Sequence, residues 1–223
     1  MKLFIVSTSI GNLEDISFRA IKTLKNSDFI ICEDTRISSI LLKQYEIKKD
    51  LVSLNAFNEK DKIKYLIERI KSVKNVSLIS DAGTPAISDP GSVFISECLK
   101  SGIDIIPVPG ASALLSALVV SGLKINSFIF EGFLPQKKGR EKKLKELASE
   151  KQTIIVYESV YRVEKLLLEL KKFMPDRYII VCKELTKKFE DVWRGYPDEL
   201  IKMIPKNKIK GEFVFIISEK EKQ

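Results

Sequence analysis

A loop of twelve residues, 80–91, has the composition best suited to hold a ligand. It reads SDAGTPAISDPG, and Ala82 and Gly83 leave its backbone open to close approach by a bound molecule. Asp81 can accept a hydrogen bond from a ribose hydroxyl or an amine. A plain connection between a strand and a helix needs only about 2–6 residues, so the length of this loop indicates a ligand site. Asp89, which precedes a proline, has a simpler interpretation as a helix N-cap.

Two other loops of small residues follow predicted strands. They span residues 7–12 and 107–113, and the second reads PVPGASA. A helix that begins with such small residues suits an anion or a flat ligand, although it also suits tight packing of the helix on a sheet. In open parallel sheets, ligands bind outside the carboxyl ends of the strands. These loops are therefore the expected ligand-binding region.

The residues that are missing limit the chemistry. The chain contains no histidine, so a Ser–His or Cys–His nucleophilic centre and a histidine base are excluded. Cys32, Cys98 and Cys182 are far apart in the sequence, which favours buried free thiols over a zinc site. Neither a G-x-G-x-x-G fingerprint after the first strand nor a P-loop motif is present, which disfavours dinucleotide and P-loop enzymes.

The net charge of +8 is unevenly distributed along the chain. Residues 1–130 carry a net charge of +2 and residues 131–223 carry +6. This basic excess suggests a polyanionic partner, although a lysine-rich composition that only keeps the protein soluble is an equal alternative. The longest apolar stretch, 111–120, is far shorter than the roughly 20 residues of a membrane span, and no secretory signal is recognisable. We expect a cytoplasmic protein.

The first half alternates short apolar runs with amphipathic segments. Strands are expected at 3–7, 28–32, 51–54, 76–80 and 104–108, and helices at 16–24, 35–45, 58–71 and 91–101. Asp15 is the expected N-cap of the first helix. This alternation predicts a mostly parallel sheet with helices on both faces.

The second half begins with an expected helix at 111–121 and then changes its rhythm. Strands are expected at 127–131, 153–157, 178–183, 190–194 and 212–218, and helices at 140–148, 160–173 and 200–204. The short link between 178–183 and 190–194 indicates an antiparallel pair, and the charged tail 219–223 is expected to fray. The sequence thus predicts two α/β domains, 1–117 with a mostly parallel sheet and 118–223 with a mixed sheet.

Eight segments, in order and over almost the whole chain, resemble the rRNA small-subunit methyltransferases I (the RsmI family) of the tetrapyrrole-methylase-like superfamily. They are TSIGNLEDISFRA (8–20), CEDTR (32–36), LISDAGTPAISDPG (78–91), VPGASALLSAL (108–118), FEGFLPQKKGR (130–140), VYESVYR (156–162), KELTKKFEDVWRG (183–195) and KGEFV (210–214).

The resemblance implies an activity and a cofactor. The expected reaction is methylation of the ribose 2′-hydroxyl of a decoding-centre cytidine in small-subunit (16S) rRNA by a homodimer. S-adenosylmethionine is expected in the cleft between the two domains. The cofactor-binding residues that it implies are Ile10, Gly11, Asp81, Ala82, Gly83, Thr84, Ile87, Ser88, Ser112, Ala113, Leu185 and Gly211.

The chain departs from the family in three places. The family usually reads TPIGN at residues 8–12 and ESPHR at 158–162, and it often has histidines at 55–59, where this chain has NAFNE. Any role of those histidines is unfilled here. We interpret them as aids to substrate binding or packing, because methyl transfer needs mainly in-line positioning of the acceptor oxygen. The alternative is an impaired enzyme.

Removal of the proton from the 2′-hydroxyl calls for a base near two predicted strand ends. The leading catalytic candidates are Asp34 and Arg36 of CEDTR and Glu184 and Lys187 of KELTK; Glu33, Glu158, Lys183 and Thr186 complete the set. The residue types do not single out one base. The alternatives are a surface or interdomain ion pair in the first segment and a solvated strand end in the second.

A basic run follows FEGFLP. Its expected RNA-binding residues are Lys137, Lys138, Arg140, Lys142 and Lys143. Contact with RNA phosphates is the preferred interpretation, and a solvated helix face is the alternative.

Two rival functions remain open. One is another superfamily enzyme, which methylates a tetrapyrrole or a modified protein side chain; the wording of the motifs and the basic second half disfavour it. The other is an RNA-binding module that has lost its cofactor, which titration with S-adenosylmethionine would distinguish.

Overall fold

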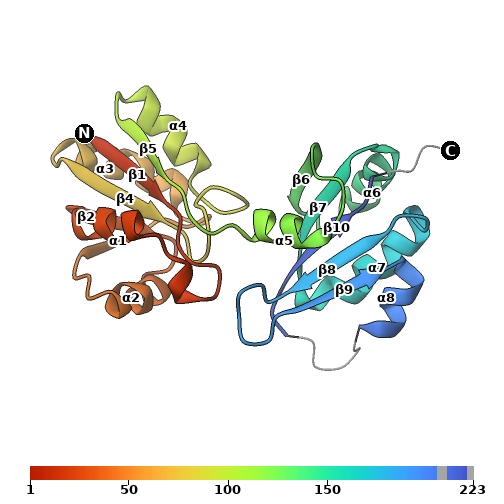
Figure 1. Ribbon diagram of the computed structural model, residues 1–223. Helices are drawn as coiled ribbons and strands as arrows, with labels where there is room; N and C mark the ends of the chain where they lie inside the picture. The colour runs from red at the N-terminus through yellow and green to blue at the C-terminus, as the bar shows by residue number, and fades with distance from the viewer. Residues whose placement is uncertain (205–209, 220–223) are drawn as a thin grey trace. The chain divides into compact units, whose positions relative to one another are not determined.

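The structure is a computed structural model that describes residues 1–204 and 210–219 (Figure 1). The chain forms two compact units, Met1–Ser112 and Ala113–Gln223. The expected boundary at 117/118 falls inside helix α5 (Ala113–Ser121), which belongs as a whole to the second unit. The predicted fraying of the tail concerns residues that, from 220 onward, lie outside the described part of the chain.

The first unit contains a five-stranded sheet in the order β3-β2-β4-β1-β5, and all its strands pair in parallel, as predicted. The strands are β1 (Lys2–Val6), β2 (Phe29–Cys32), β3 (Asp50–Ser53), β4 (Asn75–Ile79) and β5 (Asp104–Val108). The connecting helices are α1 (Phe18–Lys25), α2 (Thr35–Gln44), α3 (Glu59–Lys71) and α4 (Ser92–Lys100).

Both faces of this sheet are covered because its strands carry apolar side chains on both sides. On β2, Phe29 and Ile31 pack with α3 and α4, whereas Ile30 and Cys32 pack with α1 and α2. Side chains alternate between the faces along a strand, so a continuous apolar run is typical of a strand that is buried on both sides.

Two predicted helix caps are wrong. Asp15 lies in a short 3-10 helix, η1 (Leu13–Asp15), and the Ser17 hydroxyl caps α1 by accepting from the Ala20 amide at 3.1 Å. Asp89 does not cap α4, because Gly91 occupies the N-cap position. The acceptor there comes from another helix: Glu59 accepts from the amides of Gly91 and Phe94, each at 3.1 Å.

The second unit contains a mixed sheet, as predicted, and its strand order is β6-β7-β10-β8-β9. Its strands β6 (Phe128–Phe133) and β7 (Thr153–Ser159) are parallel, and β8 (Ile179–Lys183), β9 (Asp191–Gly195) and β10 (Glu212–Ile217) pair antiparallel to their neighbours. The expected antiparallel pair of β8 and β9 is confirmed.

Helices α6 (Arg140–Ser149), α7 (Val163–Phe173) and α8 (Pro197–Met203) share one apolar core with this sheet, while α5 lies against β10. A single 3-10 turn, η2 (Val160–Arg162), links β7 to α7. Helix α8 begins at Pro197, earlier than expected, because proline suits the first turn of a helix. Among the described residues, no helix is long and apolar enough to cross a membrane.

Candidate functional site

The loops that follow β1 and β4 are joined to each other. The Thr8 amide donates to the Gly83 carbonyl at 2.8 Å, and the Gly83 amide donates to the Ser9 carbonyl at 3.3 Å. The hydroxyl oxygens of Ser7 and Thr84 lie 2.8 Å apart. These contacts bring two of the predicted ligand loops together at the carboxyl edge of the first sheet.

The loop after β5 reaches the same edge because Gly110 has no side chain. A Cβ atom at Gly110 would lie 3.0 Å from the Ser7 Cβ and 3.2 Å from the Ser7 carbonyl oxygen. At Gly83, which has a φ of +74°, a Cβ would lie 3.2 Å from the Ile10 side chain. The small residues therefore permit close approach of the three loops, which is one of the uses of glycine.

Unusual backbone conformations gather in the predicted ligand segments. Among the described residues, five that are not glycine have a positive φ, and two of them, Ala86 and Ser88, lie in the loop 80–91. Glu184 and Thr186 lie in the loop after β8. Each such residue costs on the order of 1–3 kcal/mol, and such residues cluster at ligand and active sites.

Asp34 and Arg36 form an ion pair at the start of α2. The Arg36 guanidinium lies 2.5 Å from the Asp34 carboxylate, and the Arg36 side chain is 87% exposed. The Asp34 carboxylate also accepts from the Arg36 amide at 2.8 Å and thus caps α2. Hydrogen bonds from Arg36 lower the pKa of Asp34 to about 2, so this carboxylate is a weak proton acceptor.

Glu33 has the opposite character. Its half-buried carboxyl has a raised pKa because of burial and the nearby charges of Asp89 and Asp81. The Asp34 amide donates to Asp81 at 3.1 Å, which joins the segment after β2 to the loop 80–91. Burial also raises the pKa of Asp81. Glu33 is therefore better suited than Asp34 to accept a proton at this edge.

Glu184 and Lys187 hold each other in the loop after β8. The Lys187 ammonium lies 2.9 Å from Glu184 and 3.0 Å from Glu212, and the Glu212 amide donates to Glu184 at 2.9 Å. Burial alone would raise the pKa of Glu184 and lower that of Lys187, but these contacts outweigh it and shift both pKa values the other way. The lowered pKa makes the Glu184 carboxylate a weak proton acceptor, and the raised pKa keeps Lys187 protonated at neutral pH, so neither suits the role of a base.

The predicted cofactor residues fall in both units. Those at the carboxyl edge of the first sheet are Ile10, Gly11, Asp81, Ala82, Gly83, Thr84, Ile87, Ser88 and Ser112. Of the others, Ala113 opens α5, Leu185 lies in the loop after β8, and Gly211 directly precedes β10. A Cβ at Gly211, where φ is +108°, would overlap the Glu184 side chain.

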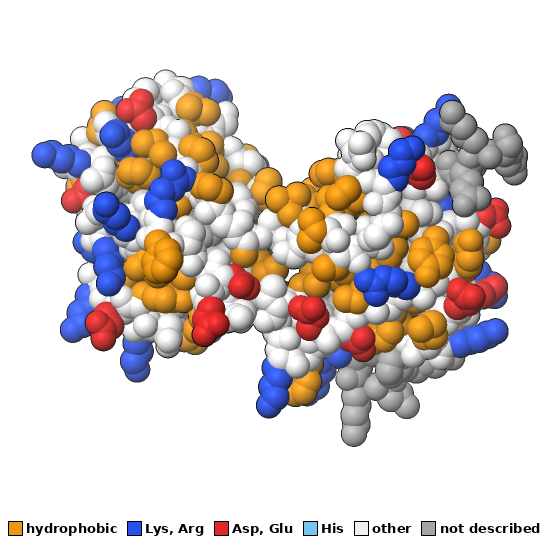
Figure 2. All heavy atoms as spheres, in the orientation of Figure 1, with side chains coloured by type: hydrophobic (Ala, Val, Ile, Leu, Met, Phe, Trp, Pro, Cys, Tyr) orange, Lys and Arg blue, Asp and Glu red, His pale blue; other side chains and the backbone are white. Residues whose placement is uncertain are grey.

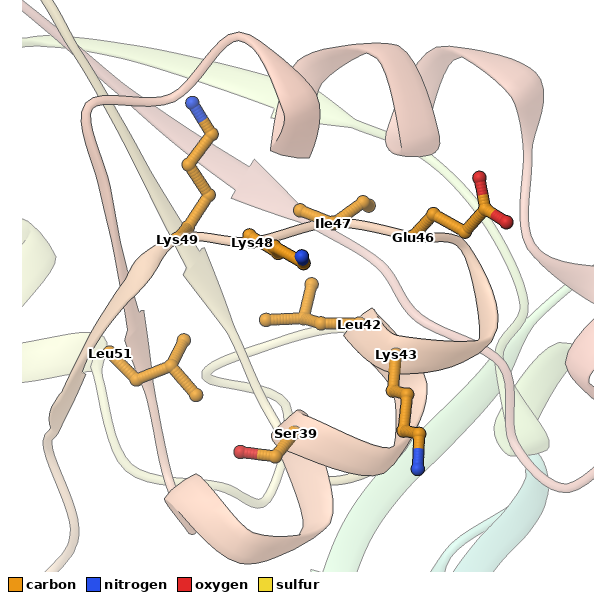
Figure 3. A pocket seen from close by; sticks show the side chains of 8 residues that line it. All are labelled: Ser39, Leu42, Lys43, Glu46, Ile47, Lys48, Lys49 and Leu51. Atoms are coloured by element: carbon orange, nitrogen blue, oxygen red, sulfur yellow. The ribbon is translucent and has the colours of Figure 1, made fainter.

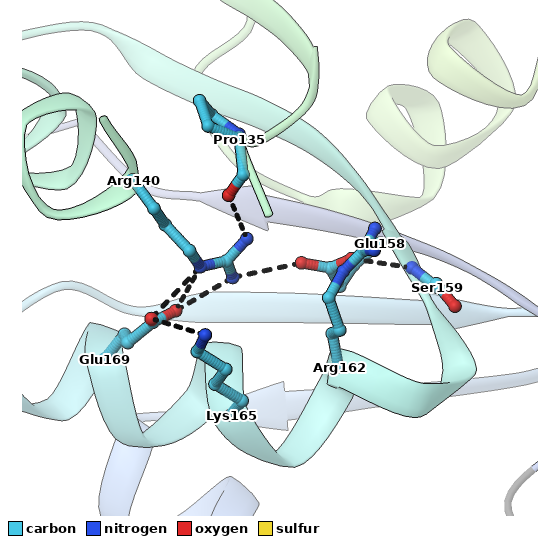
Figure 4. A network of polar contacts seen from close by, with 7 residues as sticks. All are labelled: Pro135, Arg140, Glu158, Ser159, Arg162, Lys165 and Glu169. Atoms are coloured by element: carbon cyan, nitrogen blue, oxygen red, sulfur yellow. Dashed lines mark hydrogen bonds and ion pairs between the residues drawn. The ribbon is translucent and has the colours of Figure 1, made fainter. Parts of the chain in front are cut away.

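The prediction that Arg140 contacts RNA is wrong. Its side chain is 3% exposed, and its guanidinium lies 3.1 Å from Glu158 and 2.8 Å from Glu169 (Figure 4). It also donates to the Pro135 carbonyl at 3.2 Å. On the far side, Glu158 accepts from Arg162 at 2.6 Å. Arg140 stabilises the second unit from within and cannot reach a phosphate in solvent.

The sequence does contain a signal for this burial. Arg140 lies four residues before Leu144 and seven before Leu147, so the three share one face of α6, and both leucines are buried. Lys137, Lys138 and Lys142 are exposed, as an RNA contact requires. Lys143 is partly covered and pairs with Glu131 at 3.2 Å.

Other surface features lie away from these loops. A cavity of about 640 Å³ opens between α2 and the amino end of β3, at the edge of the sheet opposite the ligand loops. Figure 3 shows its lining residues, which are Ser39, Leu42, Lys43, Glu46, Ile47, Lys48, Lys49 and Leu51.

On the face in Figure 2, basic and acidic side chains are scattered over both units, so charge alone does not mark a site there. No cluster of His, Cys, Asp or Glu among the described residues could hold a metal ion.

The fold and the sequence place the chain in a class of enzymes. Residues 2–201 match the model of the tetrapyrrole (corrin/porphyrin) methylases. Among solved structures, diphthine synthase superposes with a TM-score of 0.77 at 19% identity, over 98% of this chain and 90% of that one. A cobalt precorrin-4 methyltransferase superposes with a TM-score of 0.72 at 19% identity, over 97% and 94%. These likenesses confirm the predicted fold class.

Relatives in sequence identify the family more narrowly than the solved structures do. Ribosomal RNA small subunit methyltransferase I of Thermotoga maritima is 45% identical over 99% of both chains. The proteins of the same name from Bacillus subtilis and Haemophilus influenzae are 44% and 43% identical, over 96% and 99% of this chain and 74% and 79% of theirs. The chain belongs to the family of ribosomal RNA small subunit methyltransferase I.

Proposed function

We propose that this protein methylates the ribose 2′-hydroxyl of a cytidine in small-subunit (16S) rRNA. The observation that carries the proposal is the joined set of loops at the carboxyl edge of the first sheet, in a chain whose relatives are named for methylation of small-subunit rRNA. Ligands of open parallel sheets bind at this edge.

The residues of this edge fit S-adenosylmethionine. Gly83 and Gly110 allow the loops to approach one another, and exposed Ala82 leaves peptide groups accessible to a flat ligand. The Asp81 carboxylate can accept hydrogen bonds from hydroxyl or amino groups. When bound, the cofactor supplies a methyl group on a positively charged sulfur. The residues proposed to hold it in the first unit are Ile10, Gly11, Asp81, Ala82, Gly83, Thr84, Ile87, Ser88 and Ser112, with Ala113, Leu185 and Gly211 of the second unit.

Glu33 is the proposed acceptor of the hydroxyl proton. Because its pKa is raised, it loses its charge as the pH falls through that pKa, and activity should fall with it. Glu33→Gln should lower kcat roughly 10²- to 10⁴-fold and abolish the acidic limb of the kcat/KM profile. Asp34→Asn should keep that limb, because Asp34 stays ionised down to about pH 2. An acidic limb that persists in Glu33→Gln would assign the proton to another group.

The reaction is tested with labelled S-adenosylmethionine and small ribosomal subunits from a strain that lacks the enzyme. We expect label in protein-free 16S rRNA, mapped to one cytidine by stops in reverse transcription. Parallel reactions with free 16S rRNA show which form is the substrate. Label in a tetrapyrrole, with none in rRNA, would overturn the proposal. The proposed substrate also implies a cytoplasmic location, which cell fractionation tests.

We further propose a homodimer, supported by exposed apolar residues on α5. Val119 is 72% exposed and Val120 is 40% exposed, which leaves apolar surface that a second copy would bury. Sedimentation should show a dimer for the wild type and a monomer for Val119→Glu. A wild-type monomer at micromolar concentration would contradict the homodimer.

A further inference from the structure

Four segments of the second unit meet at one edge of its sheet. Strands β6 and β7 are parallel, so the loops after them leave the sheet at the same edge. Phe213 of β10 pairs with Glu158 of β7 on one side and with Lys183 of β8 on the other. The loop after β8 and the start of β10 therefore lie at this edge too. We call it the aromatic edge; it consists of residues 133–139, 159–162, 184–190 and 210–212.

The aromatic edge exposes large rings. Tyr161, in the 3-10 turn η2, is 93% exposed, and Phe189, in the loop between β8 and β9, is 69% exposed. Phe133, at the end of β6, is 52% exposed. Aromatic side chains contribute most to stability when they are buried, so rings held in water at one edge indicate a surface that contacts a partner.

The charges at this edge favour an anionic partner. Lys137, Lys138 and Lys188 are exposed, and no ion pair among the described residues engages any of them. The Lys188 ammonium lies 5.7 Å from the Phe189 ring. A cation beside an exposed ring is the combination that binds a phosphate and an unpaired base together.

The acidic groups at and beside the same edge are held by contacts within the protein. Arg140 and Arg162 bind Glu158, and Lys187 binds both Glu184 and Glu212. Glu190 accepts from the Thr186 amide at 2.5 Å, and the Asp191 carboxylate accepts from the amide of the next residue. The four segments of the aromatic edge carry six basic and three acidic side chains, so positive charge dominates what an approaching ligand meets.

The lysine-bearing loop is also held in a fixed conformation. Buried Arg140 donates through its guanidinium to the Pro135 carbonyl at 3.2 Å and through its amide to the Lys137 carbonyl at 3.3 Å. A loop that is fixed before binding loses less conformational entropy when it meets its ligand.

We propose that the aromatic edge binds single-stranded RNA, with the rings of Tyr161 and Phe189 stacked on bases and Lys137, Lys138 and Lys188 on phosphates. The inference rests on the proposed function, because it names the surface that would hold the substrate strand. Single-stranded RNA fits better than a duplex, since only unpaired bases offer their flat faces to a side chain.

Fluorescence anisotropy of a labelled, unstructured twelve-nucleotide RNA, measured on the full chain without cofactor, tests the rings. Tyr161→Ala and Phe189→Ala should each weaken binding roughly 5- to 100-fold, the range that corresponds to loss of one stacked base. Tyr161→Phe should bind like the wild type, whereas Tyr161→Leu should bind like Tyr161→Ala. Phe128→Ala is the matched control, because Phe128 lies at the opposite end of β6 and is 36% exposed.

The dependence of binding on salt separates the two kinds of contact. Lys137→Ala combined with Lys138→Ala should reduce the slope of log K against log salt by about 1.4, because each lost phosphate contact accounts for about 0.7 on a single strand. Tyr161→Ala should leave the slope unchanged. A wild type that does not bind the strand, full affinity in both ring variants, or equal loss on duplex RNA would overturn the inference. Strand binding without methylation of any cytidine would overturn only the proposed function.

Discussion

Replacing Arg140 by methionine is expected to lower the free energy of unfolding of the second unit by about 3 kcal/mol. The substitution leaves the fully buried Glu158 carboxylate without its closest buried cation, and loss of one partner of such a pair costs about 3–5 kcal/mol. The lower end applies because Arg162 still binds Glu158 at 2.6 Å and Glu169 is 19% exposed. The Pro135 carbonyl also loses its donor.

The chain's single tryptophan makes this loss measurable in the right unit. Trp193 lies on β9 and stacks on Phe213, so its fluorescence follows unfolding of the second sheet during a urea titration. Arg140→Met should shift the midpoint to lower urea with little change in slope.

Two matched variants control for the change of charge and size. Lys142→Met removes a cation two residues away on the same helix, but its side chain is 84% exposed, so we expect a change within about 0.5 kcal/mol. Adding Glu158→Gln to Arg140→Met should recover part of the loss, because the buried charge disappears. If Arg140→Met and Lys142→Met unfolded at the same urea concentration, the buried ion pairs of Arg140 would not contribute to the stability of the second unit.

Arg140 also shows where prediction from sequence is strong and where it is weak. Apolar periodicity located the sheets and helices, because a strand with two buried faces and a helix with one apolar stripe leave patterns in neighbouring residues. The same periodicity placed Arg140 in line with Leu144 and Leu147. The cluster of lysines around it favoured a surface role instead, and its partners Glu158 and Glu169 are 18 and 29 residues away.

The predicted caps of two helices were also wrong. Asp89 and Asp15 have residue types that suit caps, but Glu59 of another helix supplies the acceptor at α4, and Ser17 caps α1 after an added 3-10 turn. At α4 the acceptor is distant along the chain and leaves no local signal, whereas at α1 the cap is local and the error lay in where the helix begins.

Part of the candidate site could be predicted from the sequence and part could not. The meeting of the loops after β1, β4 and β5 could be expected, because the carboxyl ends of parallel strands share an edge and small residues permit close contact. The charge states of the candidate bases could not be predicted from the sequence. Glu33 has a raised pKa through burial and through Asp89 and Asp81, which are distant in sequence. Glu184 and Lys187 depend on Glu212, which lies at the start of the neighbouring strand β10 and is distant from them in sequence.

Replacing Gly211 by alanine is expected to destabilise the second unit by roughly 2–4 kcal/mol and to weaken S-adenosylmethionine binding. Two costs combine. A φ of +108° is unfavourable for an L-residue, at roughly 1–2 kcal/mol, and the new Cβ would overlap the Glu184 side chain. Glu184 cannot move away cheaply, because it accepts from Lys187 and from the Glu212 amide, both at 2.9 Å.

Gly122→Ala isolates the first of these costs. Gly122 has a φ of +70° at the end of α5, and nothing lies within 4 Å of a Cβ built there. Its variant should cost only the backbone term of a left-handed residue, so the difference between the two alanine variants in Trp193-monitored unfolding contains the overlap with Glu184 together with the extra cost of a φ of +108°. Gly211→Ala should therefore cost less in a Glu184→Ala background than in the wild type, because the side chain that collides is gone. Calorimetry should show weaker S-adenosylmethionine binding for Gly211→Ala than for Gly122→Ala, as expected if Gly211 and Leu185 hold the cofactor. Equal stability and equal cofactor affinity of the two variants would exclude both the overlap with Glu184 and the role in cofactor binding.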